Sequence, residues 1–158
     1  MKLILAVFIC FFCLHLSAQK LDINILEKIT YSSVRVADSL LKSSQFQLTD
    51  KQSGKGYTNY YYTSYERKDL FEHMLRSLSF MDVHNANDTS RLVLYRTYYK
   101  DEYEEMKKQL LAGGYEMQKQ AGNEFIYKKG GFTIINKISD KKVKGTKTMT
   151  AYEYELGR

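Results

Sequence analysis

The chain has 158 residues, of which 27% are charged, 44% hydrophobic and 14% aromatic, so it is globular, with one domain or at most two small ones. The formal net charge is +6, and proline and tryptophan are absent. Both cysteines, Cys10 and Cys13, lie in an apolar N-terminal segment. Thiol catalysis, thiolate metal sites and iron–sulfur clusters are therefore excluded from the chain after that segment.

The N-terminal segment has the features of a secretory signal peptide. Lys2 precedes an apolar run over residues 3–16, and Ser17 and Ala18 follow as small residues. The run is shorter than the roughly 20 apolar residues that cross a bilayer, so we expect cleavage after Ala18 rather than a permanent anchor. The ending Ser-Ala-Gln resembles signal peptides of the Bacteroidetes, which implies a periplasmic or secreted protein.

The first predicted element after the signal peptide is an amphipathic helix over residues 23–41. Its inner face is marked by apolar residues at helical spacing, namely Leu26, Ile29, Val36 and Leu40. Ser32 and Ser33 can break it into two helices. Strands are expected after it, over residues 46–51, 57–67 and 91–99.

Residues 70–80 allow two interpretations. Their apolar residues fit a helix on spacing alone, namely Leu70, Phe71, Met74, Leu75 and Leu78. A strand over residues 74–83 instead pairs with the strand at 91–99 through the polar turn at residues 85–88. We favour the strand.

A second helix is predicted over residues 100–111, with one apolar face formed by Tyr103, Met106, Leu110 and Leu111. Gly113 and Gly114 end it. Four strands follow, over residues 115–120, 124–129, 132–139 and 148–156, with a hairpin turn at residues 130–131. In the last strand, tyrosines and Leu156 alternate with Glu153 and Glu155, which indicates one buried and one wet face.

The two halves of the chain resemble one another. In each, an amphipathic helix ends on a leucine pair, small residues follow, and an alternating strand begins. The corresponding residues are Leu40 and Leu41 with Leu110 and Leu111, and Phe46 and Leu48 with Tyr115 and Met117. We therefore predict an α+β fold of two α-β-β-β-β repeats, residues 19–99 and 100–158, in one compact domain. Helices would cover one face of an antiparallel sheet.

In element order and length, this plan resembles the β-lactamase inhibitor protein fold, a tandem of a helix plus a four-stranded sheet whose concave surface grips an enzyme. The resemblance spans most of residues 19–158. It implies a non-catalytic binding protein of the inhibitor type. The cysteines of that family are absent here, and no functional residue is carried over by position.

Motifs for catalysis are sparse. His73 and His84 with Asp82 or Asp88 could form a ligand set, but HExxH is absent and turn preference explains the segment. There is no G-x-S-x-G, G-x-G-x-x-G or Walker sequence. We expect no metal and no cofactor. The catalytic alternative is a small metal-dependent hydrolase of envelope polymers, centred on His73, Asp82 and His84.

Tyrosine is the unusual component, because all 14 tyrosines follow the signal peptide. In a strand over residues 57–65, Tyr57, Tyr61 and Tyr65 share one face, and Tyr60 and Tyr62 share the other. Tyrosine packs well in sheets and also serves as a contact residue in interfaces. The second property predicts an open sheet face that holds a protein partner or an envelope glycan. Its contact residues would be Tyr60, Tyr62, Tyr95, Arg96, Tyr152 and Tyr154.

A lysine-rich stretch at residues 137–147 suggests another role. A solvated loop explains it, but Lys141, Lys142 and Lys144 could also contact anionic lipid or an acidic protein. The corresponding alternative is an envelope assembly factor that docks through this loop. Export makes nucleic acid a poor partner.

Overall fold

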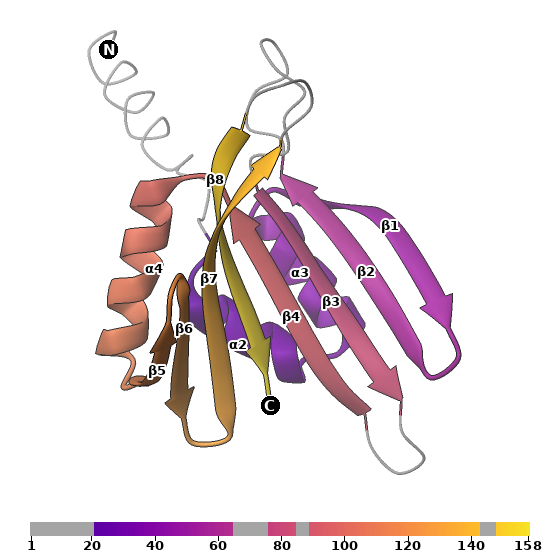
Figure 1. The fold of residues 1–158 in the computed structure, drawn as a ribbon. Coiled ribbons are helices and arrows are strands. Elements are labelled where there is room, and N and C mark those ends of the chain that lie inside the picture. Colours follow the sequence, from indigo (N-terminus) through magenta and orange to yellow (C-terminus); the bar gives the residue numbers. More distant parts are fainter. Residues whose placement is uncertain (1–20, 65–75, 85–88, 143–147) are drawn as a thin grey trace, which may run out of the picture.

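The computed structural model describes residues 21–64, 76–84, 89–142 and 148–158 (Figure 1). Three helices lie in these residues: α2 (Ile23–Tyr31), α3 (Val34–Ser43) and α4 (Lys100–Ala112). Eight strands accompany them: β1 (Phe46–Gly54), β2 (Tyr57–Ser64), β3 (Arg76–His84), β4 (Thr89–Thr97), β5 (Glu116–Ala121), β6 (Glu124–Lys129), β7 (Phe132–Lys142) and β8 (Thr148–Gly157).

The eight strands form one antiparallel sheet in the order β1-β2-β3-β4-β8-β7-β6-β5. In each half of the chain the first strand lies at an edge of the sheet and the last strand at its centre. The last strands of the two halves, β4 and β8, therefore pair with each other. We call this β4–β8 junction the seam. The predicted α+β class with an antiparallel sheet is confirmed.

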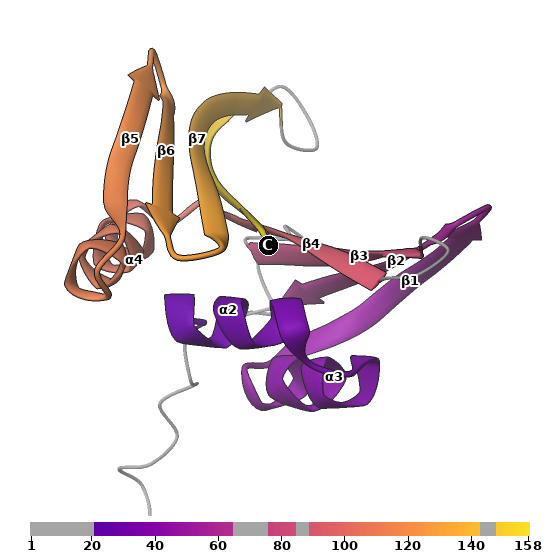
Figure 2. The same ribbon diagram turned by 90° about the horizontal axis from the view of Figure 1, so that it is seen from below.

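The helices gather on one side of the sheet. Figure 2 shows α2 and α3 beneath β1–β4, and none of the helices that the structure describes lies above these strands. Helix α2 also contacts α4, β4 and β8, so it lies beneath the seam. We call the sheet side turned away from α2 the open face. On β3 and β4 it carries Ser77, Ser79, Met81, Val83, Leu92, Leu94 and Arg96, which alternate with buried residues.

The core lies between the helices and the side of the sheet that faces them, which is the side opposite the open face. Leu26, Ile29 and Leu41 come from the helices and are fully buried. From the strands, large side chains point toward them, including Phe80, Tyr95 and Tyr154, none of which is exposed to solvent. Because full burial of one large apolar side chain contributes about 1.5 to 3 kcal/mol, this single layer supplies the main stabilisation of the fold.

The predicted break at Ser32 and Ser33 is confirmed, because α2 ends at Tyr31 and α3 begins at Val34. Ser33 caps α3, since its Oγ accepts a hydrogen bond from the Val36 backbone N–H at 3.4 Å. The inner face predicted for the second part is wrong at Val36. Val36 is 42% exposed, whereas Leu40 is half-buried and packs against the core, and Ala37 and Leu41 are fully buried. The break changes the direction of the helix, so one helical period does not continue through it.

Helix α4 extends one residue beyond the predicted end and buries Tyr103, Met106 and Leu110, as expected. Leu111, also assigned to this face, is 54% exposed. The predicted glycine stop is confirmed. Gly114 has φ +80°, and the Tyr115 backbone N–H donates to the Leu110 carbonyl at 3.0 Å, which closes a Schellman motif.

The ambiguous segment is a strand from Arg76 to His84, as favoured. Residues 65–75, which include Tyr65 and the first part of that segment, lie outside the described residues. The other predicted strands are present with bounds shifted by a few residues. The predicted hairpin at Gly130 is also present, since Lys129 pairs with Phe132 and Gly130 has φ +55°.

Candidate functional site

The tyrosines predicted to contact a partner lie on the helix-facing side of the sheet. Tyr62, Tyr95 and Tyr154 are at most 1% exposed, and Tyr152 is 9% exposed. Tyr60 is half-buried, and its ring stacks on Phe80 with 4.7 Å between centroids. The prediction that these five tyrosines form an exposed surface is therefore wrong.

Their hydroxyl groups explain why the core tolerates them. The Tyr95 hydroxyl donates to Glu102 Oε1 at 2.7 Å, and the Tyr154 hydroxyl donates to the Tyr103 carbonyl at 2.8 Å. The Tyr62 hydroxyl donates to Asp38 Oδ1 at 3.3 Å. Each ring thus buries its apolar body while its polar end is satisfied within the chain. These tyrosines therefore serve in sheet packing, the first of the two roles considered for tyrosine in the sequence.

Buried tyrosines make the fold sensitive to alkali. Burial raises the pKa of Tyr103 to about 12, and burial also raises the pKa of Tyr95 and of Tyr154. In the unfolded chain these phenols titrate near pH 10. Their contribution to stability is therefore fully present below about pH 10 and is lost as the pH rises toward the folded pKa values, by up to about 1.4 kcal/mol per pH unit for each tyrosine.

We expect urea unfolding to give a constant free energy between about pH 8 and about pH 9.5, and a steep decline above about pH 10. Phenolate absorbance should show these tyrosines ionising only as the protein unfolds. Complete ionisation near pH 10 with the fold intact would contradict their burial.

The residues of the hydrolase hypothesis do not form a ligand set in the described chain. The Asp82 carboxylate is buried and ion-paired with Arg91, whose Nη2 donates to Asp82 Oδ2 at 3.0 Å. His84 is exposed at the end of β3, and His73 lies outside the described residues. Among the residues that are described, no group of three or more His, Cys, Asp and Glu side chains could hold a metal ion. Both side-chain oxygens of Asp82 thus accept hydrogen bonds from Arg91.

The lysines of the assembly hypothesis lie at the end of β7. The Lys141 side chain is 39% exposed, and its Nζ is 3.8 Å from Glu153 Oε2. Lys142 is exposed, and Lys144 lies outside the described residues. Lys141 is therefore partly engaged by the sheet itself.

Arg96 is the predicted contact residue that does lie on the open face. Its Nε donates to Glu153 Oε1 at 2.7 Å across the seam. The strand register continues this pair into a row of alternating charge, because Glu153 lies opposite Lys137 on β7 and Lys137 lies opposite Glu124 on β6. Cross-strand pairs of opposite charge stabilise a sheet modestly, so this row organises the surface of the seam.

In the next row along the strands, three apolar side chains flank a single glutamate at the seam. Glu155 of β8 lies opposite Leu94 of β4 on one side and opposite Ile135 of β7 on the other. Ile135 in turn lies opposite Ile126 of β6. All four side chains are half-buried.

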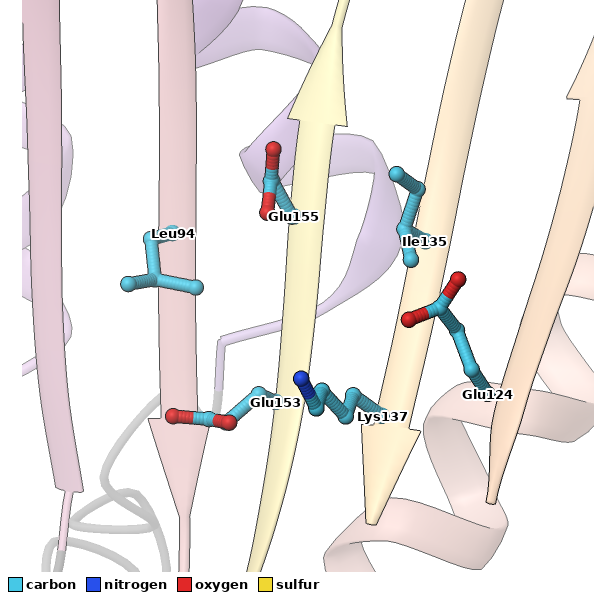
Figure 3. A pocket seen from close by; sticks show the side chains of 6 residues that line it. All are labelled: Leu94, Glu124, Ile135, Lys137, Glu153 and Glu155. Carbon is cyan, nitrogen blue, oxygen red and sulfur yellow. The ribbon is translucent and has the colours of Figure 1, made fainter. Parts of the chain in front are cut away.

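A hollow of about 230 Å³ lies over these two rows. Figure 3 shows side chains from four neighbouring strands around it, with Glu155 between Leu94 and Ile135. Its remaining lining residues are Glu124, Lys137 and Glu153. The hollow therefore joins the two halves of the sheet on the side that no helix covers in the described chain.

Beyond the hollow, toward β2, the open face mixes apolar and aromatic side chains with polar ones such as Ser79 and Asn59. Met81 lies opposite Leu92, and both are half-buried. Tyr61, whose hydroxyl accepts a hydrogen bond from Asn59 Nδ2 at 2.8 Å, lies opposite Ser79, and Tyr57 at the end of β2 is 43% exposed. The open face thus combines apolar side chains with the charged row at the seam.

The sequence contained a signal for this face. The glutamates of the last strand were predicted to mark a wet face, and both lie on the open face, where Glu155 is half-buried and Glu153 is only 8% exposed. The contact residues were nevertheless chosen from the other alternation, which carries the tyrosines. Leu94 and Ile135 were not singled out, because a half-buried aliphatic residue in a strand has no distinguishing pattern.

Comparison with known proteins gives no match: no family model matches the chain, nor does any curated protein or solved structure. In the part of the chain that the structure describes, no helix is long and apolar enough to cross a membrane.

Proposed function

We propose that this chain is a non-catalytic, exported binding protein that holds a protein partner on its open face, as an inhibitor or immunity-type module does. The observation that carries this proposal is the open face itself. It runs across the seam without a covering helix in the described chain, yet it carries half-buried apolar side chains such as Met81, Leu92 and Leu94. An accessible face that mixes apolar and aromatic side chains with polar ones is typical of a protein–protein interaction site.

We further propose that two α-β-β-β-β repeats build this face. The element order supports it, and so do two matching bulges in the edge strands. In β1 the register shifts between Leu48 and Asp50, and in β5 it shifts between Met117 and Lys119. Leu48 and Met117 are the residues that correspond in the sequence comparison of the two halves. Each also pairs with a buried tyrosine, Tyr62 or Tyr127.

The curvature of the sheet favours a partner that binds through a protruding segment. In Figure 2, β5, β6 and β7 rise from the plane of β1–β4 on the side away from α2 and α3. The open face therefore lies on the inside of the bend. This arrangement resembles the concave surface of the β-lactamase inhibitor protein fold, and a loop or turn of a partner fits it better than a flat surface does.

The test is capture of a partner by matched variants. Leu92→Asp and Met81→Asp place a charge on the open face, whereas Leu111→Asp places one on the helix side at a residue that is 54% exposed. We expect the first two variants to weaken partner binding in an envelope extract at least about tenfold, because a buried unpaired charge opposes association. Leu111→Asp should bind as the unchanged protein does. Equal capture by all three, with melting temperatures unchanged, would remove the open face as the binding surface.

A further inference from the structure

Glu155 differs from the other acidic residue at the centre of the open face. Glu153 accepts a hydrogen bond from Arg96, and Lys141 lies 3.8 Å from its second oxygen. The Glu155 side chain makes no hydrogen bond and no ion pair within the described chain, and its cross-strand neighbours are Leu94 and Ile135. A single carboxylate therefore interrupts an apolar row at the seam.

This arrangement is tolerated only while water reaches the carboxylate. A partner that covers the open face removes that water, and an ionised carboxylate that loses its water without gaining a partner is strongly unfavourable. Lys137 lines the same hollow, but neither it nor another basic residue of the described chain forms an ion pair with Glu155. A tightly bound partner must therefore bring a cation.

The hollow fits a long basic side chain. Its lining has three acidic residues, Glu124, Glu153 and Glu155, against one basic residue, Lys137. Arg96 and Lys141 both compensate Glu153 from outside the lining, whereas no basic residue of the described chain forms an ion pair with Glu155. Leu94 and Ile135 offer apolar walls, and lysine and arginine place an aliphatic stem on such surfaces while the charged end contacts a carboxylate.

We propose that the partner of the open face inserts a lysine or arginine side chain into this hollow, with its cationic group on Glu155. The inference rests on the proposed function and specifies the chemistry of the partner. The aliphatic stem of that side chain lies against Leu94 and Ile135, and the residues that flank it in the partner cover the apolar part of the face.

Selection of random peptides displayed on phage against the purified protein tests the inference without knowledge of the natural partner. The peptides that bind the open face are identified as those that no longer bind Leu92→Asp. We expect them to share a lysine or arginine next to apolar residues. The same selection on Glu155→Lys should instead enrich aspartate or glutamate at that position, because the charge of the hollow is reversed.

The affinity of one selected peptide gives the second readout. Glu155→Gln is expected to weaken it about thirtyfold or more, since a charged pair is lost in a site without water. Glu104→Gln, at an exposed carboxylate on α4, should leave the affinity unchanged. Open-face peptides that lack a basic residue, or that bind Glu155→Gln as well as the unchanged protein, overturn the inference alone. If no selected peptide is sensitive to Leu92→Asp, the proposed function itself fails.

Discussion

Replacing Arg91 with methionine is expected to lower the free energy of unfolding by about 3 to 5 kcal/mol. The Arg91 side chain is 8% exposed and joins three parts of the molecule. It pairs with Asp82 of β3, and its Nη1 donates to the carbonyls of Ile29 at 2.8 Å and Ser32 at 2.7 Å. It therefore satisfies the C-terminal carbonyls of α2, which the helix cannot satisfy itself. Methionine leaves both these carbonyls and the Asp82 carboxylate without the cation.

Two variants separate the buried role from a general effect of losing an arginine. Arg35→Met changes an exposed residue of α3 and should alter the free energy of unfolding by less than about 0.5 kcal/mol. Asp82→Leu combined with Arg91→Met should be more stable than Arg91→Met alone, because no buried charge remains. Urea unfolding followed by circular dichroism measures all three. A loss of less than about 1 kcal/mol for Arg91→Met would contradict the assigned role.

Replacing Glu102 with glutamine is expected to cost about 2 to 4 kcal/mol. Glu102 lies in the first turn of α4, is 3% exposed, and accepts three hydrogen bonds. The donors are Arg76 Nε at 2.7 Å, the Tyr95 hydroxyl at 2.7 Å and Thr97 Oγ1 at 2.8 Å. Glutamine removes the negative charge beside Arg76 and turns an acceptor oxygen into a donor group that faces other donors.

The matched control is Glu105→Gln on the same helix, where the side chain is 60% exposed. It should change the free energy of unfolding by less than about 0.5 kcal/mol. Chemical unfolding of the two variants side by side decides the prediction. Equal stabilities would show that Glu102 does not hold α4 on the sheet.

The elements were predictable because their signals are local. Helix α4 follows from apolar spacing and a glycine pair, and β6 follows from a two-residue glycine turn, so both lie close to their predicted bounds. The inner face of α3 was not predictable in the same way, since the break at Ser33 changes the phase of the helix.

The candidate site was harder to predict because strand alternation defines two faces without saying which one is covered. In β2 both alternations carry tyrosine, so hydrophobicity does not choose between Tyr61 and Tyr62. Contacts from distant parts of the chain decide which face is buried. Asp38 of α3 accepts a hydrogen bond from the Tyr62 hydroxyl, and the ring of Phe80 of β3 stacks on the Tyr62 ring with 5.8 Å between centroids. Asp82 was considered as a metal ligand for the same reason, because its partner Arg91 and the end of α2 meet it only in the fold.

The most direct measurement is photo-cross-linking from two matched serines in cells that make the partner. Ser79 lies in the middle of β3 on the open face, between Tyr61 and Leu94, and Ser39 is exposed on α3. With a photoreactive residue at either position, we predict a discrete adduct from Ser79 and none from Ser39. An adduct from Ser39 in the absence of one from Ser79 would mean that a partner binds the helices and that the uncovered side of the sheet is not the binding surface.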